Sequence, residues 1–132
     1  MRMAVVMGAL ALAGCAATAQ PQSKVQERAG RELAKALEGR VAGEPRDCIS
    51  AMGTSGPQII DGRTMLYRQG SKVWRNDLPT SCPGLDDDDL LVIELWGSQI
   101  CRNDHFRANS RTSMIPGPSC RFGKFTPYVK AR

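Results

Sequence analysis

Cysteine number and spacing constrain this chain more than any other feature of its sequence. The 132 residues include five cysteines, at positions 15, 48, 82, 101 and 120. The last four lie too far apart for a zinc finger or ribbon, and none of them forms a Cys-x-x-Cys pair. In an exported chain, which meets an oxidising environment, Cys48, Cys82, Cys101 and Cys120 are expected to form two disulfides. Four cysteines allow three pairings, and the sequence does not choose among them.

The first cysteine ends an apolar N-terminal segment. Arg2 precedes an uncharged apolar run over residues 4–13, which is shorter than the roughly 20 residues of a membrane-spanning helix. The run has the length of the hydrophobic region of a signal peptide. Residues 12–15, Leu-Ala-Gly-Cys, resemble the lipobox of bacterial lipoproteins, in which the signal is cut before the cysteine and its thiol takes lipid. We therefore expect residues 1–14 to be a signal peptide and Cys15 to carry lipid.

The residues around this cysteine also indicate an address. Ala16 follows Cys15, where an aspartate would retain a lipoprotein in the inner membrane, so the resemblance implies an outer-membrane lipoprotein facing the periplasm. The membrane is then a partner through the N-terminal lipid. The rival interpretation is ordinary cleavage after Ala19, at the Ala-Thr-Ala site, which would release a soluble periplasmic protein. Lipidation also leaves an even number of cysteines for the domain, which strengthens the disulfide prediction.

Charge is distributed unevenly along the chain. The formal net charge is +5. From Cys101 to the end a single acid, Asp104, accompanies the basic residues Arg102, Arg107, Arg111, Arg121, Lys124, Lys130 and Arg132. A basic face keeps a domain soluble, and in the envelope it can also contact anionic lipid headgroups or other polyanions. Nucleic acid is not an expected partner there, and the sequence does not fix the oligomeric state.

Residues 15–46 are expected to form a lipidated leash and a helix. Small and polar residues occupy 16–22, and the helix is predicted over about 23–39. Its apolar residues recur at helical spacing, at Val25, Ala29, Leu33, Ala36, Leu37 and Val41. Ser23 with Gln26 forms a capping box, and Gly39 is the predicted C-terminal cap. We expect the apolar stripe to pack on the domain, with a free spacer as the alternative.

Residues 47–132 have the pattern of a β-rich domain. Short runs of β-branched and aromatic residues alternate with turn residues, and strands are predicted over 47–51, 57–60, 63–68, 72–76, 90–95, 98–102, 105–108 and 120–127. Gln69-Gly70-Ser71 and Trp96-Gly97 are predicted to join hairpins. Leu90-Leu91-Val92-Ile93 is continuously apolar and is predicted to be a central strand. The predicted fold is mainly β, a small disulfide-linked β-barrel or sandwich preceded by one N-terminal helix.

Several short motifs resemble those of a known family. They are Cys48-Ile49, Ile60-Asp61 before residues 63–68 (Arg-Thr-Met-Leu-Tyr-Arg), Trp74-Arg75-Asn76, Cys82-Pro83-Gly84-Leu85, Cys101-Arg102-Asn103-Asp104, Pro116-Gly117-Pro118-Ser119-Cys120 and Phe122-Gly123-Lys124-Phe125. Together they resemble a family of small exported proteobacterial proteins known as a domain of unknown function. The resemblance covers about residues 47–128, and the four-cysteine order is its most specific part. His105 departs from it by replacing an aliphatic residue. The family implies an exported disulfide domain and brings no catalytic residues.

The residues that could carry chemistry do not form a catalytic set. His105 is the only histidine, and on a strand its neighbour Asp104 would point to the opposite face. Ser110, Ser113 and Ser119 lack a nucleophile elbow, and the domain cysteines are expected in disulfides. We therefore expect no catalytic residue and no cofactor. If the protein is an enzyme, His105 with nearby acids is the remaining candidate.

Acidic residues have structural interpretations that are favoured over binding roles. Asp86-Asp87-Asp88-Asp89 lacks the alternating ligands, central glycine and closing glutamate of an EF-hand loop. A solvated loop that guards the next strand against aggregation is favoured over a calcium site, and no metal site is predicted. Asp61 and Asp104 follow strand ends, where turn chemistry is favoured over a pair of acids in a groove.

A surface site and a core can both be proposed from side-chain type. The candidate surface residues are Asp61, Arg75, Asn76, Arg102, Asp104 and His105. The aromatic residues expected in the core rather than in a binding groove are Trp74, Trp96, Phe122, Phe125 and Tyr128.

The expected function is that of a non-enzymatic envelope lipoprotein. Its β domain would bind another periplasmic protein or a cell-wall or lipid polymer. The alternative is an inhibitor of an envelope hydrolase, such as a muramidase or a protease.

Overall fold

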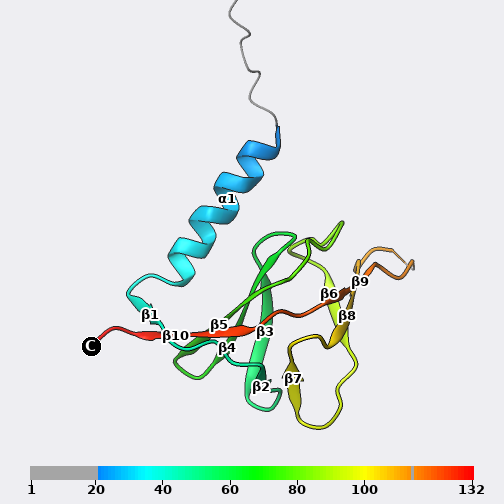
Figure 1. Ribbon diagram of the computed structural model, residues 1–132. Coiled ribbons are helices and arrows are strands. Elements are labelled where there is room, and N and C mark those ends of the chain that lie inside the picture. Colours follow the sequence, from blue (N-terminus) through cyan, green and yellow to red (C-terminus); the bar gives the residue numbers. More distant parts are fainter. Residues whose placement is uncertain (1–20, 114) are drawn as a thin grey trace, which may run out of the picture.

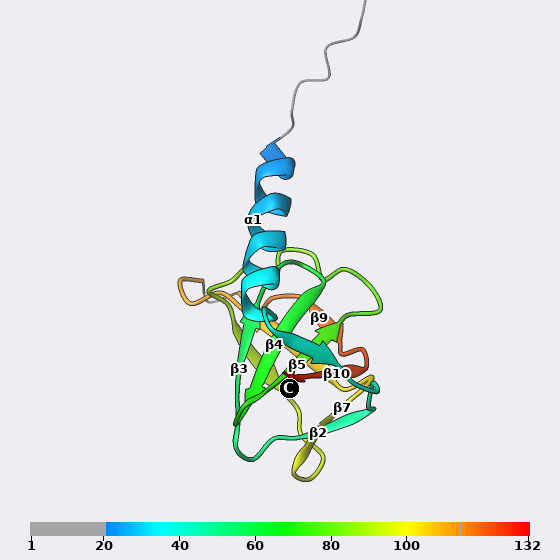
Figure 2. The ribbon, with the colours of Figure 1, turned by 90° about the vertical axis from the view of Figure 1, so that its left-hand side faces the viewer.

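The computed structural model describes residues 21–113 and 115–132 (Figures 1 and 2). The predicted signal peptide, Cys15 and the alternative cleavage site after Ala19 lie outside the described residues. In the described part of the chain, no helix is both long enough and apolar enough to cross a membrane.

A helix leads into the sheets. α1 (Pro21–Ala36) begins at a proline, which suits a first helical turn because the N–H groups there have no partner within the helix. The helix therefore begins before Ser23, earlier than the predicted start at about residue 23. The chain leaves α1 through Gly39, whose φ of 66° is left-handed, as expected for the predicted C-terminal cap.

The large sheet has five antiparallel strands in the order β1-β10-β5-β4-β3 (Figure 1). Their bounds are β1 Arg40–Ala42, β3 Thr54–Ile59, β4 Thr64–Gln69, β5 Lys72–Asp77 and β10 Phe125–Lys130. The predicted hairpin at residues 69–71 is confirmed, because Gln69 of β4 pairs with Lys72 of β5. The sequence did not predict β1, which pairs with β10. The sheet thus begins at Arg40, before the predicted start of the β-rich domain at residue 47.

Two smaller sheets form the opposing layer. β2 (Cys48–Ser50) pairs with β7 (Gln99–Cys101), while β8 (His105–Asn109) lies between β6 (Leu90–Ile93) and β9 (Ser119–Arg121). We call the sheet β6-β8-β9 the small sheet. The hairpin predicted at Trp96-Gly97 is wrong, because β6 pairs with β8 and β7 pairs with β2.

The strand predicted over residues 120–127 is divided between two sheets. Its first part is β9, and its second part begins β10 of the large sheet. Gly123 lies at the crossing, where the carbonyl oxygen of Asp77 occupies the place that a Cβ would need. Asn76 of β5 fixes the same point: its Nδ2 donates to the Gly123 carbonyl at 2.8 Å, and its Oδ1 accepts the Gly123 N–H at 2.9 Å. A buried side chain thereby joins the two layers.

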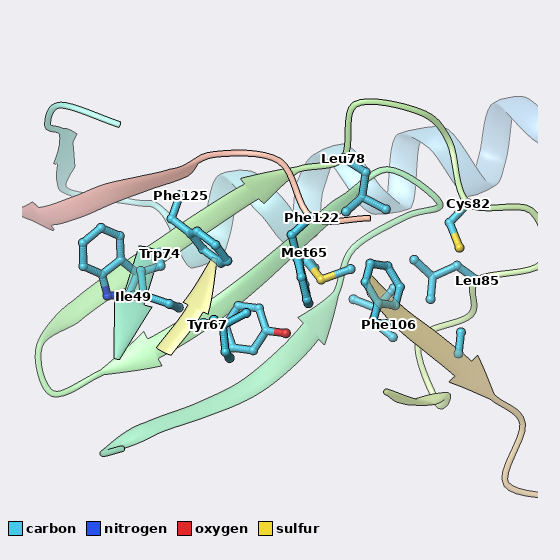
Figure 3. Packing of buried hydrophobic residues seen from close by; sticks show 13 residues of the cluster. Ile49, Met65, Tyr67, Trp74, Leu78, Cys82, Leu85, Phe106, Phe122 and Phe125 are labelled. Atoms are coloured by element: carbon cyan, nitrogen blue, oxygen red, sulfur yellow. The ribbon is translucent and has the colours of Figure 1, made fainter. Parts of the chain in front are cut away.

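The large sheet is covered on both faces. Ala29 is buried against Ile60, Leu66 and Val73, so the predicted packing of the helix stripe on the domain is confirmed for this part of α1. The other face packs against the smaller sheets through a core that holds Ile49, Ile59, Met65, Tyr67, Trp74, Leu78, Cys82, Leu85, Ile100, Phe106, Ala108, Phe122 and Phe125 (Figure 3). Open sheets packed in this way form a β-sandwich with one helix, which confirms the predicted fold class.

The aromatic residues divide between core and surface. Trp74, Phe122 and Phe125 are buried, as predicted. Tyr128 is half-buried and packs against the residues that contact Ala29 of α1. The core prediction is wrong for Trp96, whose residue surface is 86% exposed.

β6 is not the central strand that its apolar sequence predicts. It lies at the edge of the small sheet, and Leu90 and Val92 are 47% and 53% exposed. β4 has the central role instead, since four consecutive residues from Thr64 to Tyr67 are buried. The physical reason is that β4 has the helix on one face and the core on the other, whereas β6 packs on one face alone.

The two disulfides choose one of the three possible pairings. Cys48 is bonded to Cys101, and Cys82 is bonded to Cys120. The first joins directly opposite residues of β2 and β7. The second ties β9 to the segment that follows β5, and so fixes an edge strand of the small sheet to the core.

Candidate functional site

The six candidate surface residues do not come together in one site, although Asp61 and Arg75 line the same hollow. Asp61 serves the turn before β4, where its Oδ1 accepts the N–H groups of Arg63 at 2.8 Å and Thr64 at 2.7 Å. Asp104 serves the turn after β7, where its Oδ2 accepts the N–H of Cys101 at 2.7 Å. Both carboxylates therefore carry out the turn chemistry that the sequence favours.

Three further candidates lie in separate environments. Arg75 Nε is 2.9 Å from Asp77 Oδ2; burial would lower the pKa of Arg75, but the hydrogen bond and charge of Asp77 outweigh it and raise that pKa. Arg102 Nε is 3.4 Å from Asp47 Oδ1 in an exposed ion pair. Asn76 has none of its surface exposed and bonds to Gly123, so it is not a surface residue.

His105 is exposed on the outer face of the small sheet. Exposed and buried residues alternate along β8, and Phe106 and Ala108 enter the core. His105 and Arg107 therefore share the opposite, solvent-facing side.

Strand register brings two residues of β9 beside them. His105 lies opposite Arg121, and Arg107 lies opposite Ser119. Directly opposite residues of antiparallel strands share a face. Cys120, between Ser119 and Arg121, is partly buried and held by its disulfide to Cys82. We call His105, Arg107, Ser119 and Arg121 the quartet.

β6 continues the same face with apolar side chains. Val92 lies opposite Arg107, and Leu90 lies opposite Asn109. Leu91 and Ile93 alternate with them and pack against the core. The outer face of the small sheet thus combines two exposed aliphatic side chains with the quartet.

The surface is hollowed on both sides of His105. One hollow, of about 540 Å³, is lined by His105, Ser119 and Arg121 together with Asn103 and the Pro79–Pro83 segment. The other, of about 220 Å³, is lined by His105, Arg107 and Ser119 together with Val92 and Glu94. Because His105 and Ser119 line both hollows, the quartet forms the ridge between them.

The electrostatics of this face are positive. Among the described residues, the Arg107 and Arg121 side chains form neither an ion pair nor a hydrogen bond. Glu94 is the one carboxylate that lines either hollow. The arrangement therefore offers guanidinium and hydroxyl donors to an anion.

Among the described residues, the hydrogen-bond neighbour of the imidazole is a hydroxyl and not a carboxylate. His105 Nδ1 is 3.5 Å from Ser119 Oγ, at the limit of a hydrogen bond. The Asp104 carboxylate is engaged by the Cys101 N–H instead. The geometry is that of an open polar surface rather than of a histidine oriented by a carboxylate.

The acidic run at residues 86–89 forms its own turn. The N–H of Asp86 donates to Asp89 Oδ2 at 3.0 Å, and Arg28 of α1 lies 3.2 Å from Asp87 Oδ2. Arg111 Nε donates to the Asp88 carbonyl at 2.7 Å. Across residues 21–113 and 115–132, no group of three or more His, Cys, Asp or Glu side chains is arranged to hold a metal ion.

Sequence reasoning found His105 and missed the other quartet residues as a set. The signal for them is weak: a His-x-Arg pair and a Ser-x-Arg pair, each with the two-residue period of a strand. Their meeting depends on the register between β8 and β9, which the sequence pattern does not contain.

Comparison with models of known families, with curated proteins and with solved structures finds no match for this chain. The resemblance of its motifs to a family of small exported proteins stays an expectation. The function is therefore inferred from the residues of this chain.

Proposed function

We propose that this protein is a non-enzymatic binding module of the bacterial cell envelope, which binds an anionic envelope polymer on the outer face of the small sheet. In this proposal lipid on Cys15 holds the module at the outer membrane, facing the periplasm.

The observation that carries the binding proposal is the exposure of unpaired cations beside apolar side chains. Arg107 faces solvent opposite Val92 of β6, and Arg121 faces solvent on β9, on the other side of β8, in a sheet whose other face is part of the core. Exposed apolar groups next to hydrogen-bond donors of one charge sign are typical of a recognition surface. Such a face fits a polymer that presents anionic groups along an extended, partly apolar backbone.

One observation supports the envelope location, and a second fits an anchor that precedes α1. The Cys48–Cys101 and Cys82–Cys120 disulfides are the bonds expected of a domain that folds in an oxidising compartment. The N-terminal end of α1 also extends beyond the sheets (Figures 1 and 2). A tether that precedes Pro21 would therefore leave the small sheet free to bind.

Co-sedimentation tests the binding proposal. Mature protein in mild detergent is mixed with isolated cell-wall sacculi or with lipopolysaccharide, and the pelleted fraction is measured at low and physiological salt. We expect wild-type protein to pellet with at least one polymer and the double variant R107S/R121S to bind about tenfold more weakly or worse, since each lost charge contact costs roughly 1 kcal/mol or more.

The matched control is K130S/R132S, which removes the same charge from exposed residues outside the small sheet. It is expected to bind almost as wild type does. Equal loss in both double variants would show a general effect of net charge, and failure of wild-type protein to pellet with either polymer would refute the proposal.

Mass spectrometry of the mature N-terminus tests the anchor separately. A chain that begins at diacylated or triacylated Cys15 is expected. An unmodified chain that begins at Gln20 would exclude the anchor and leave the binding proposal standing.

A further inference from the structure

We infer that the quartet is a binding site for a phosphate group. The inference rests on the proposed function, because it names the anion that the outer face of the small sheet takes.

Strand register places the donors around one point. Arg107 lies opposite Ser119, and Arg121 lies two residues farther along β9. Arg107 and Arg121 are therefore diagonal neighbours, at positions whose Cα atoms are about 7–8 Å apart in an antiparallel pair. Guanidinium groups on side chains of that length can converge on a single anion between them, with the Ser119 hydroxyl and the His105 ring completing its surroundings.

The two arginines of the quartet favour binding of an anion, because neither has a hydrogen-bond acceptor or an acidic partner among the described residues. Most described arginines form a hydrogen bond or an ion pair with a carboxylate, an amide or a carbonyl oxygen, as do Arg28, Arg40, Arg63, Arg68, Arg75, Arg102 and Arg111. Arg107 and Arg121, like Arg31, Arg46 and Arg132, do not, and these two are close neighbours of like charge. An anion that bridges two neighbouring guanidinium groups relieves their mutual repulsion as well as forming new bonds.

The ionisable side chains around the site leave its net charge positive. On β8 the ionisable side chains of the outer face are His105 and Arg107, and on β9 Arg121. From the β6 side Glu94 faces them across the smaller hollow. One carboxylate against two guanidinium groups leaves a net positive site whichever form the imidazole takes.

The shape of the donor set favours phosphate over carboxylate. A carboxylate is planar and is satisfied by one bidentate guanidinium. A phosphate monoester carries close to two negative charges near neutral pH and presents three acceptor oxygens in different directions. Two guanidinium groups from different strands and a hydroxyl beside both match the second geometry better.

Held by its disulfide, β9 also presents the site in a fixed form. Cys120 is bonded to Cys82 in the core, and Ser119 and Arg121 flank it on the outer face. The backbone therefore needs no rearrangement to bind, and the cost of binding falls mainly on the two arginine side chains.

Thermal unfolding of the mature protein tests the site with inorganic phosphate as the probe. Melting is followed in sodium phosphate, in sodium acetate and in sodium chloride, all at equal ionic strength and pH. At a phosphate concentration about tenfold above Kd, the melting temperature is expected to rise by about 5 °C over chloride. Acetate is expected to give a smaller rise or none.

Variants distinguish phosphate binding at the quartet from a general effect of the salt on stability. R107S/R121S is expected to lose the phosphate shift while melting in chloride at or above the wild-type temperature, because two repelling charges are removed. S119A and H105A are expected to keep part of the shift, and K130S/R132S all of it. An equal shift in wild type and R107S/R121S would overturn the inference, as would an acetate shift that matches phosphate.

A comparison with glycerol 3-phosphate distinguishes the source of the group. A shift as large as that with inorganic phosphate supports a phosphoester on a larger molecule, because the site is open at both hollows. A shift with inorganic phosphate alone supports free phosphate as the ligand. If wild-type protein pellets with an envelope polymer through Arg107 and Arg121 but neither phosphate compound shifts melting, the proposed function stands and the phosphate assignment is wrong.

Discussion

The large sheet and the small sheet differ in how many of their faces are covered. In β4, four consecutive residues from Thr64 to Tyr67 are buried, because α1 covers one face and the core covers the other. In β8, exposed and buried residues alternate, and His105 and Arg107 remain in solvent. A strand covered on both faces is committed to packing. A strand covered on one face keeps half of its side chains in solvent, and among the described residues β8 and its neighbour β9 present the unpaired arginines Arg107 and Arg121 there.

Replacement of a core aromatic residue is expected to have the largest effect. Phe122 is fully buried, with its ring centroid 4.7 Å from that of Phe106 and 5.8 Å from that of Phe125. F122A should lower the free energy of unfolding by about 3–5 kcal/mol, measured by urea denaturation. The comparison variant V92A, on the exposed outer face of the small sheet, should change the free energy of unfolding by less than about 0.5 kcal/mol. Similar losses in both variants would mean that the outer face of the small sheet is covered.

Replacement of one asparagine in each sheet is expected to change the free energy of unfolding by an intermediate amount. Asn76 makes two buried hydrogen bonds to Gly123, whereas Asn109 of β8 accepts one, from the partly buried Gly117 N–H at 3.2 Å. N76L should cost about 2–4 kcal/mol, because both Gly123 backbone groups lose their partner in the interior. N109L should cost about 1 kcal/mol, since water can replace its bond. The reverse order in urea denaturation would contradict the assignment of Asn76 as the link between the two layers.

The smallest effect is expected at Tyr67, where a change of one atom should stabilise the large sheet. The Tyr67 hydroxyl is buried without a hydrogen-bond partner among the described residues. Y67F removes that unsatisfied group and should raise the free energy of unfolding at pH 7 by about 1 kcal/mol. A loss at pH 7 would show that the hydroxyl is satisfied in solution.

The same variant has a pH signature. Burial raises the pKa of Tyr67 well above its ordinary value of about 10, so the folded state keeps a proton that the unfolded state releases. The contribution of Tyr67 to stability is therefore constant below about pH 10 and falls as pH rises toward the folded-state pKa. The advantage of Y67F over wild type should widen between pH 9 and pH 11. A constant difference across that range would contradict the raised pKa.

Local sequence patterns predicted the elements that local physics stabilises. The Gln69-Gly70-Ser71 hairpin, the helix stripe that buries Ala29 and the pairing of four cysteines into two disulfides all followed from spacing and residue type. The turn roles of Asp61 and Asp104 followed in the same way, because each carboxylate bonds an N–H within three residues. Such features depend on neighbours along the chain.

The candidate site could be predicted only in part. His105 stood out as the one histidine, but Asn76 looked equally polar and is buried, because Gly123 from a distant segment satisfies both ends of its amide. Nothing in the sequence marks Arg107 and Arg121 as neighbours, because the register of β8 on β9 depends on the whole sandwich.

By itself, then, the sequence determined a mainly β domain with one helix and two disulfides, and it indicated an exported chain with a candidate lipid anchor at Cys15. The tertiary structure decided which cysteines pair, which strand is central and which charges meet. Leu90–Ile93 shows the reason most clearly: its composition suits a strand buried on both faces, yet it lies at an edge. Burial depends on what packs against a strand from elsewhere in the chain. The hydrophobic pattern of a strand shows only that it could be buried.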